Sequence, residues 1–204
     1  MKKIISLIFV FIIPFSFIYV QMPVTAKTVS SRTKAVRAYK KFLKKHKKYK
    51  KFSLIYLDNN KTPELLTQKV DDLDYVVSIY TYSNGKLKKK DSVVYLIEEP
   101  TKEFVYYKKT GVYISSFAAD AYYWSYYYKY NKGKIKELNL STERNVWEKS
   151  PSYYCKILNN DENNKETLTK EEFNKALKKY TNGKKSSAAK FYKNTKSGRK
   201  KHCK

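Results

Sequence analysis

The stretch Tyr75-Val-Val-Ser-Ile-Tyr-Thr-Tyr82, followed directly by Ser83-Asn-Gly85, decides the fold class of this chain. Its β-branched and aromatic residues favour an extended strand, and Asn-Gly is a strong signal for a two-residue hairpin turn. A strand that turns back at once must pair antiparallel with the strand that follows it. The hairpin therefore predicts an antiparallel sheet, and similar strands and turns continue on both sides of it.

Short β-branched and aromatic runs, separated by turns such as Thr110-Gly111 and Lys132-Gly133, predict the remaining strands. Their regular, short spacing favours hairpins over parallel βαβ units, and therefore a meander of about seven to nine strands. The expected strands cover residues 52–57, 64–67, 75–82, 92–97, 104–108, 112–117, 122–130, 134–138 and 152–158.

Two segments with helical periodicity flank these strands. An apolar stripe runs through residues 31–47 with lysines elsewhere, and Ser31 is the expected cap. Near the other end, Thr169-Lys-Glu-Glu172 is a capping box and Gly183 ends the second helix. The predicted class is α+β, an antiparallel β meander flanked by an N-terminal basic helix and a C-terminal helix. The first helix either packs on the domain or lies on an anionic membrane.

The N-terminus has the pattern of a secretory signal. Lys2 and Lys3 precede an apolar run, and Val24-Thr-Ala26 is a typical cleavage site. The alternative is an uncleaved anchor, because basic residues that follow the apolar run resist translocation. We expect a secreted or envelope-associated protein with a signal peptide (1–26), a basic amphipathic helix (27–51), a β-rich domain ending in a helix (52–183) and a basic tail (184–204). The tail is expected to be mobile, apart from a helical turn around 188–192.

The net charge of +26 is concentrated at the two ends of the expected mature chain. Residues 27–51 hold twelve Lys or Arg and residues 184–204 hold nine, without one acidic residue, whereas residues 52–183 carry only about +3. Forty of the forty-four basic residues are Lys, which suits diffuse attraction to a polyanion better than sequence-specific reading of a nucleic acid. The plainer interpretation is that the lysines reflect genome composition.

The expected partner is therefore an anionic cell-wall polymer, such as a teichoic acid, or an anionic membrane surface. The residues expected to bind it are Lys40, Lys41, Lys44, Lys45, Lys47, Lys48, Lys50, Lys51, Lys184, Lys185, Arg199, Lys200 and Lys201.

The run 122–130 offers a second kind of site. Its even-numbered residues are all aromatic, so one strand face is wholly aromatic, and Tyr123 and Tyr127 lie on the opposite face. One face is expected to be core. If Tyr123 and Tyr127 are exposed, they form a platform for stacking sugar rings, which makes a carbohydrate-binding module the alternative function.

The segment from Tyr56 to Glu64 has the outline of a calcium loop, with Asp58, Asn60 and Glu64 at ligand positions. Tyr56 replaces the first carboxylate of such a loop, and Lys61 replaces the glycine of its sharp turn. Both departures weaken Ca²⁺ binding, so the sequence predicts a plain turn and no metal or other cofactor.

Phe52-Ser-Leu-Ile-Tyr-Leu-Asp-Asn-Asn-Lys-Thr-Pro-Glu-Leu-Leu66 resembles a segment of uncharacterised secreted proteins of gut Gram-positive (clostridial-type) bacteria. In those proteins the segment usually reads F-A-L-x-D-x-N-x-D-G-x-P-E-L-L. It is similar, more distantly, to the calcium loop of FG-GAP or VCBS propeller blades. The resemblance implies secretion and a β-rich fold, and it supplies no established activity.

The few reactive residues do not form a catalytic motif. His46 and His202 are the only histidines, and neither lies in a pattern that pairs a nucleophile with an oriented base. Cys155 is expected to point toward the core with Cys203 loose in the tail, while a disulfide between them is the alternative. We therefore expect a non-enzymatic protein.

Overall fold

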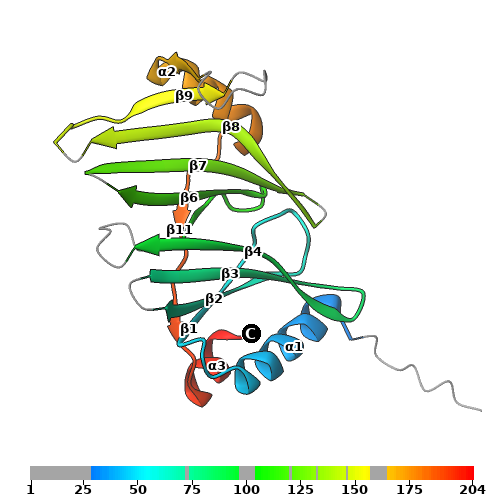
Figure 1. The fold of residues 1–204 in the computed structure, drawn as a ribbon. Helices are drawn as coiled ribbons and strands as arrows, with labels where there is room; N and C mark the ends of the chain where they lie inside the picture. The colour runs from blue at the N-terminus through cyan, green and yellow to red at the C-terminus, as the bar shows by residue number, and fades with distance from the viewer. Residues whose placement is uncertain are drawn as a thin grey trace, which may run out of the picture.

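The computed structural model of the chain describes residues 29–71, 74–96, 104–119, 121–131, 133–145, 147–156 and 165–204. These residues form twelve strands in two antiparallel sheets, together with three helices (Figure 1). The predicted α+β class is confirmed, with three strands beyond the nine expected, at Lys165–Leu168, Ser187–Ala188 and Tyr192–Lys193. The expected signal peptide lies outside the described residues. None of the described helices has the length and apolarity needed to cross a bilayer.

The first sheet contains β1 (Lys51–Ile55), β2 (Glu64–Asp71), β3 (Asp74–Ser83), β4 (Lys86–Leu96) and β12 (Tyr192–Lys193). The second contains β5 (Val105–Tyr106), β6 (Val112–Ala119), β7 (Tyr122–Asn131), β8 (Lys134–Asn145), β9 (Ser152–Lys156), β10 (Lys165–Leu168) and β11 (Ser187–Ala188). Their spatial orders are β12-β1-β2-β3-β4 and β10-β9-β8-β7-β6-β5-β11. Within each sheet, consecutive strands are therefore neighbours, as in a meander, except for β11 and β12; the chain crosses from the first sheet to the second between β4 and β5.

Side chains that cap the backbone mark where the first two helices begin. In α1 (Ser31–Lys45) the cap is Ser30, one residue before the expected Ser31, and its hydroxyl accepts from the amide of Thr33. The predicted capping box is confirmed in α2 (Lys170–Thr181), where Thr169 and Glu172 satisfy each other's amide groups. A third helix, α3 (Lys196–His202), lies near the C-terminus.

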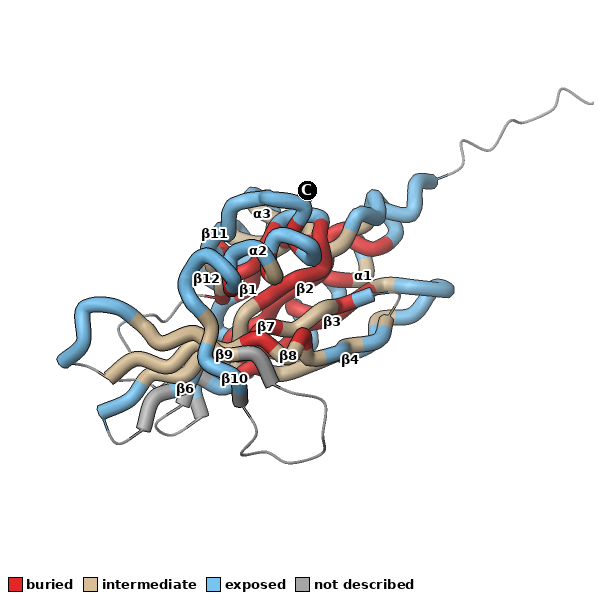
Figure 2. The backbone as a smooth tube through the Cα atoms, turned by 90° about the horizontal axis from the view of Figure 1, so that it is seen from above, coloured by how far each residue is buried: buried red, intermediate tan, exposed pale blue. Residues whose placement is uncertain are grey.

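The core has three parts, and the buried segments are drawn red in Figure 2. Side chains from both sheets, including Leu66, Val77, Phe104 and Tyr113, form a shared core that joins them. A second part lies between α1 and the five-stranded sheet, and a third lies between α2 and the seven-stranded sheet. The helices α1 and α2 thus each cover one sheet, as their apolar stripes require.

The C-terminal segment differs from the expected mobile tail. Its chain runs from α2 at one end of the molecule to α3 at the other (Figure 1). On the way, β11 pairs with β5 and β12 pairs with β1, so the segment adds one strand to each sheet. The predicted helical turn around 188–192 is wrong, because the backbone there makes these extended pairings instead. Ala189 is buried in the shared core.

Gly111 fixes the turn between β5 and β6 against both sheets. Its amide donates to the Leu57 carbonyl at 2.6 Å, and its own carbonyl accepts from the Tyr130 amide at 2.8 Å. A Cβ atom at this position would lie 2.1 Å from the Tyr130 carbonyl oxygen, and its φ of +82° is unfavourable for other residues. Only glycine therefore permits this close approach.

We expect Gly111→Ala to destabilise the protein far more than Gly85→Ala. Gly85 also has a positive φ, of +75°, but a Cβ atom added there would meet no atom within 4 Å, so only the backbone penalty of roughly 1–2 kcal/mol applies. At Gly111 the backbone itself must move. Thermal unfolding of both variants would measure the difference, and equal losses would contradict this account of the turn.

Candidate polyanion-binding surface

The two basic ends of the chain meet at one end of the molecule. Strand β12 pairs with β1 so that Lys193 lies opposite Lys51 and Tyr192 opposite Phe52. Cys203, next to the last residue, is fully buried in the cluster that α1 forms with the five-stranded sheet. Segments more than a hundred residues apart in sequence thus form one surface. We call this surface the basic end and define it as α1, residues 46–51, β12 and α3.

Asn194 connects the two segments. Its side-chain amide donates to the Leu43 carbonyl at 3.1 Å and to the Tyr49 carbonyl at 2.9 Å, and its own amide donates to the Lys50 carbonyl at 2.8 Å. Its side-chain oxygen accepts from the guanidinium of Arg199 at 2.7 Å. Each hydrogen-bonding group of this side chain is therefore used, which fixes α3 beside α1.

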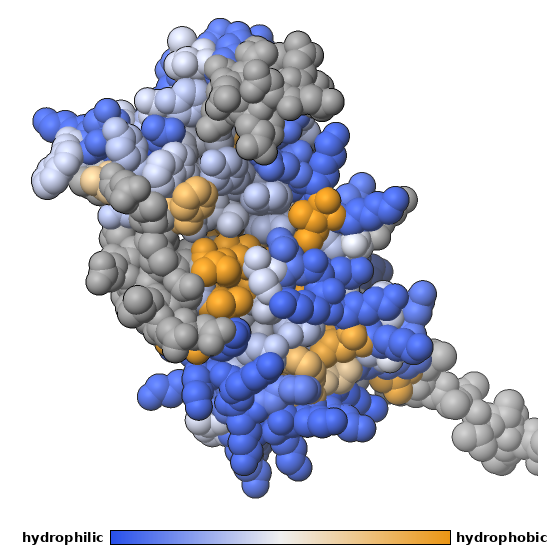
Figure 3. All heavy atoms as spheres, viewed as in Figure 1, coloured by the Kyte–Doolittle hydropathy of each residue, from blue (hydrophilic) through white to orange (hydrophobic). Residues whose placement is uncertain are grey.

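A hollow of about 600 Å³ lies where these segments meet. The cations that line it are Lys44, Lys47, Lys50, Lys51, Lys193, Lys196 and Arg199. None of the described residues that line the hollow is acidic, and no acidic residue occurs in residues 27–51 or 184–204 of the sequence. Figure 3 shows strongly hydrophilic atoms concentrated at this end of the molecule. The surface has closely spaced positive charges without neighbouring negative ones.

The structure brings together most of the cations that the sequence singled out. Lys44, Lys47, Lys50, Lys51 and Arg199 line the hollow. Exposed on the same two segments are Lys40, Lys41, Lys45, Lys48, Lys200 and Lys201. Arg199 differs from the lysines because it is half-buried and its guanidinium donates hydrogen bonds to Asn194, which gives it a structural role.

Lys184 and Lys185 do not belong to this surface. They line a different hollow beside α2, and the Lys184 ammonium donates to the Lys108 carbonyl at 3.2 Å. Lys193 and Lys196, in contrast, were not among the expected residues although they line the basic hollow. Their place depends on the pairing of β12 with β1, for which a two-residue strand gives almost no sequence signal.

The aromatic strand β7 does not form the platform of Tyr123 and Tyr127 that the sequence suggested. Tyr127 is buried, with its ring 5.4 Å from that of Phe173 in α2, so Tyr123 and Tyr127 cannot form an exposed pair. Tyr123 remains half-buried at the edge of a pocket. On the opposite face Tyr122 is exposed, whereas Tyr128 and Tyr130 pack in the shared core.

We define the aromatic patch as Phe117, Tyr122, Trp124 and Tyr126. The Phe117 ring stacks on Trp124 at 5.0 Å and on Tyr126 at 5.8 Å, and Tyr122 stacks on Trp124 at 5.7 Å. Phe117 is 41 % exposed and Tyr122 is 36 % exposed. The indole N–H of Trp124 donates to Glu143. The patch is therefore accessible and has ordered rings.

The suspected calcium loop forms a turn in which side-chain oxygen atoms accept hydrogen bonds from backbone amides of the same segment. Asp58 accepts from the amide of Asn60 at 3.0 Å, and Asn60 accepts from the amide of Thr62 at 2.7 Å. Glu64 accepts from the amide of Leu57 at 2.9 Å. All three predicted ligands line one cavity of about 410 Å³, but Lys88 and Lys90 line it too. Within the described part of the chain, no three His, Cys, Asp or Glu residues are grouped as metal ligands would be.

Glu64 is almost wholly buried, and this burial raises the pKa of its carboxyl from 4.5 to about 8. The Leu57 amide opposes the shift, and the charge of Asp58 adds to it. At neutral pH the carboxyl is therefore mainly protonated. In this form it keeps its hydrogen bond to the loop without the cost of a buried charge.

Cys203 is a free thiol, and burial raises its pKa to about 11. The expectation of a loose Cys203 is therefore wrong, since the residue is held in the core beside α1. The predicted inward orientation of Cys155 concerns a side chain that lies outside the described ones.

We expect Glu64→Gln to reduce the dependence of stability on pH. In wild type, the unfolded chain releases this proton near pH 4.5 and the folded protein only near pH 8, so ionisation favours unfolding as the pH rises. The contribution of Glu64 lowers the free energy of unfolding across this window by up to about 1.4 kcal/mol per pH unit. A glutamine at this position stays neutral, so the variant should gain stability relative to wild type toward pH 8.

Denaturant unfolding at a series of pH values would measure this difference. Glu171→Gln, at an exposed position in the first turn of α2, should keep the wild-type pH profile. If Glu64→Gln follows the wild-type profile as well, Glu64 is not the buried acid that the structure indicates.

Known proteins give no direct guide to this surface. No protein-family model matches the chain. No curated protein and no solved structure with which the chain was compared matches it either. The resemblance of residues 52–66 to secreted bacterial proteins stays a prediction. A function is therefore inferred from the charges and the geometry of the basic end.

Proposed function

We propose that the protein is a non-enzymatic binding protein that attaches to an anionic surface of the cell envelope through its basic end. The observation that carries this proposal is the meeting of two acid-free, lysine-rich segments at one hollow. The binding partner is a phosphate-rich wall polymer or an anionic membrane surface. The N-terminal signal pattern supports a place outside the cytoplasm.

The chemistry of the lysines fits such a partner. An exposed ammonium is a strongly hydrated point charge without the fixed planar geometry of guanidinium, so a lysine cluster attracts repeated phosphates without selecting one orientation. Like charges so close together repel each other, and a polyanion relieves this repulsion when it binds. Each lysine near an anionic surface contributes roughly 1 kcal/mol, and this contribution decreases as salt is added.

We expect the combined variant K44Q/K47Q/K193Q/K196Q to lose binding by roughly 10²-fold or more, on the basis of about 1 kcal/mol per lysine. Binding would be measured on purified poly(glycerol phosphate) and on vesicles of phosphatidylcholine with phosphatidylglycerol. The two arms distinguish a wall polymer from a membrane. Wild-type binding should weaken steeply with salt, and the variant should show a shallower dependence.

The matched control is K86Q/K134Q/K136Q/K149Q, which removes the same charge from exposed sites outside the basic end. It should bind nearly as wild type does. If both variants lose binding equally, the attraction depends on net charge and not on this surface. If wild type binds neither the polymer nor the vesicles, the proposal is wrong.

A second candidate function is glycan binding by the aromatic patch. Stacked, partly exposed rings can pack against the apolar faces of sugars, and Glu143 lies beside Trp124 as a hydrogen-bonding group. This candidate differs from the expected Tyr123–Tyr127 platform, since it uses the opposite face of β7.

We expect Trp124→Ala to weaken binding to insoluble cell-wall glycan by roughly 3- to 10-fold, because the stacking contact is lost. This binding should change little with salt, in contrast to binding by the basic end. Tyr180→Ala, which removes an exposed aromatic ring from α2, is the control. A wild-type protein that does not sediment with the glycan at high salt would exclude this second function.

A further inference from the structure

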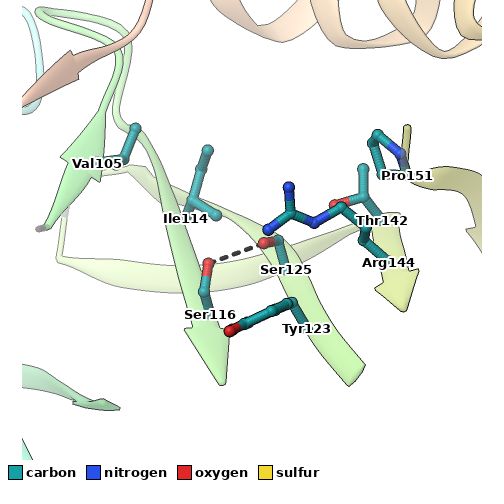
Figure 4. A pocket seen from close by; sticks show the side chains of 8 residues that line it. All are labelled: Val105, Ile114, Ser116, Tyr123, Ser125, Thr142, Arg144 and Pro151. Atoms are coloured by element: carbon teal, nitrogen blue, oxygen red, sulfur yellow. Dashed lines mark hydrogen bonds between the residues drawn. The ribbon is translucent and has the colours of Figure 1, made fainter. Parts of the chain in front are cut away.

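A pocket of about 310 Å³ lies on the α2-facing side of the seven-stranded sheet, apart from the basic end and from the aromatic patch (Figure 4). Its floor is a row of hydroxyl side chains on neighbouring strands. Ser116 on β6 is the partner of Ser125 on β7, and Ser125 is the partner of Thr142 on β8. Ile114 lies at one edge of the pocket, and Pro151 adds a second apolar group at the opposite edge.

Tyr123 and Arg144 also line the pocket. They are cross-strand partners on β7 and β8, and the guanidinium carbon of Arg144 lies 5.2 Å from the centre of the Tyr123 ring. In Figure 4 the Arg144 side chain reaches over the sheet toward β7 and does not turn away from the pocket. Both side chains are half-buried, so the stacked pair is partly shielded from water.

Among the described residues, Arg144 has no counter-charge in this pocket. None of the described residues that line it is acidic, and none of them forms an ion pair with Arg144. A guanidinium stays charged at every physiological pH and presents paired donors in a planar fork. This fork matches the two oxygen atoms of a carboxylate or phosphate. Arg144 is, moreover, one of only four arginines in a chain with forty lysines.

The hydroxyl row can add donors to the same ligand. The hydroxyl groups of Ser116 and Ser125 are 2.8 Å apart, and this hydrogen bond uses the proton of only one of them. The other proton is free to donate, and Thr142 supplies a third hydroxyl. The Tyr123 ring and the apolar residues at the two edges of the pocket can contact a ring-shaped body. The volume is near the lower limit for ligand pockets, which suits one sugar-sized unit.

We propose that this pocket binds a carboxylate or phosphate group carried on a sugar, with Arg144 as its main anion-binding residue and Tyr123 against the sugar ring. This inference goes beyond the attraction of a polyanion to the basic end and does not rest on it. The basic end offers many lysines without fixed geometry, whereas this pocket offers one oriented fork and adjacent hydroxyls. The pocket is therefore suited to recognising a single anionic unit.

The test is binding of D-glucuronate, glucose 6-phosphate and glucose to the full mature chain, measured by calorimetry and by NMR. At least one of the two anionic sugars should bind more tightly than glucose, and the two arms show whether carboxylate or phosphate is preferred. The largest shifts of backbone amide signals should fall at Tyr123, Ser125 and Arg144. Binding to poly(glycerol phosphate) is measured alongside, so that failure of either proposal is distinguishable.

Arg144→Gln should weaken binding of the anionic sugar by roughly 10- to 100-fold, since a charged hydrogen-bonding partner is lost. Arg144→Lys keeps the charge but not the fork, and should give a smaller loss. The control is Lys134→Gln, which removes one exposed charge from the same strand. All three variants should still bind poly(glycerol phosphate).

The proposal is wrong if wild type binds neither anionic sugar more tightly than glucose, or if Arg144→Gln binds them as wild type does. Should the variants fail to fold, the wild-type NMR shifts still decide the matter. Shifts located at the lysines of the basic end, with none near Arg144, would overturn the assignment of this pocket.

Discussion

Strand β1 would be an unpaired edge of the five-stranded sheet if β12 did not lie beside it. An open edge leaves backbone donors and acceptors without protein partners and invites pairing with other chains. Here the edge is closed by the end of the same chain, and Asn194 adds hydrogen bonds to the backbone around α1. The position of α3, the burial of Cys203 and the form of the basic end all depend on this closure.

The closure is formed against an electrostatic cost. It brings together two segments that hold only positive charges, where attraction between side chains cannot help. Buried contacts of Cys203 with the α1 cluster and neutral hydrogen bonds donated by Asn194 to backbone carbonyls compensate for the repulsion. A domain that needed only to be stable would place some acids here. The arrangement is therefore easier to understand if the charges serve an external anion.

Local signals in the sequence were enough for most of the fold. The Asn84-Gly85 turn, the Thr169 capping box and the alternation of apolar residues each concern a few neighbouring residues, and the structure contains them. The pairings of β11 and β12 were not foreseen, because strands of two residues have no measurable period. Lys193 and Lys196 were missed for the same reason.

The assignment of faces was ambiguous in the sequence, because both sides of β7 carry aromatic residues. Packing covers part of each side: Phe173 contacts Tyr127 on one, and Tyr128 and Tyr130 pack in the shared core on the other. Arg144 could have been noticed as a rare arginine, but its position opposite Tyr123 depends on strand register, which shifts at a bulge between Tyr126 and Tyr128. Prediction of the pocket around Arg144 thus requires strand register and long-range packing, whereas most of the fold follows from local signals.

The burial of Cys203 has a consequence for the order of events during biosynthesis. Cys203 is synthesised after every other residue of its cluster, so α1 lacks its complete set of core contacts until that point. The five-stranded sheet likewise lacks its β12 edge until Tyr192 and Lys193 have been added. This part of the core therefore forms late in synthesis, when segments that are far apart in the sequence can first meet.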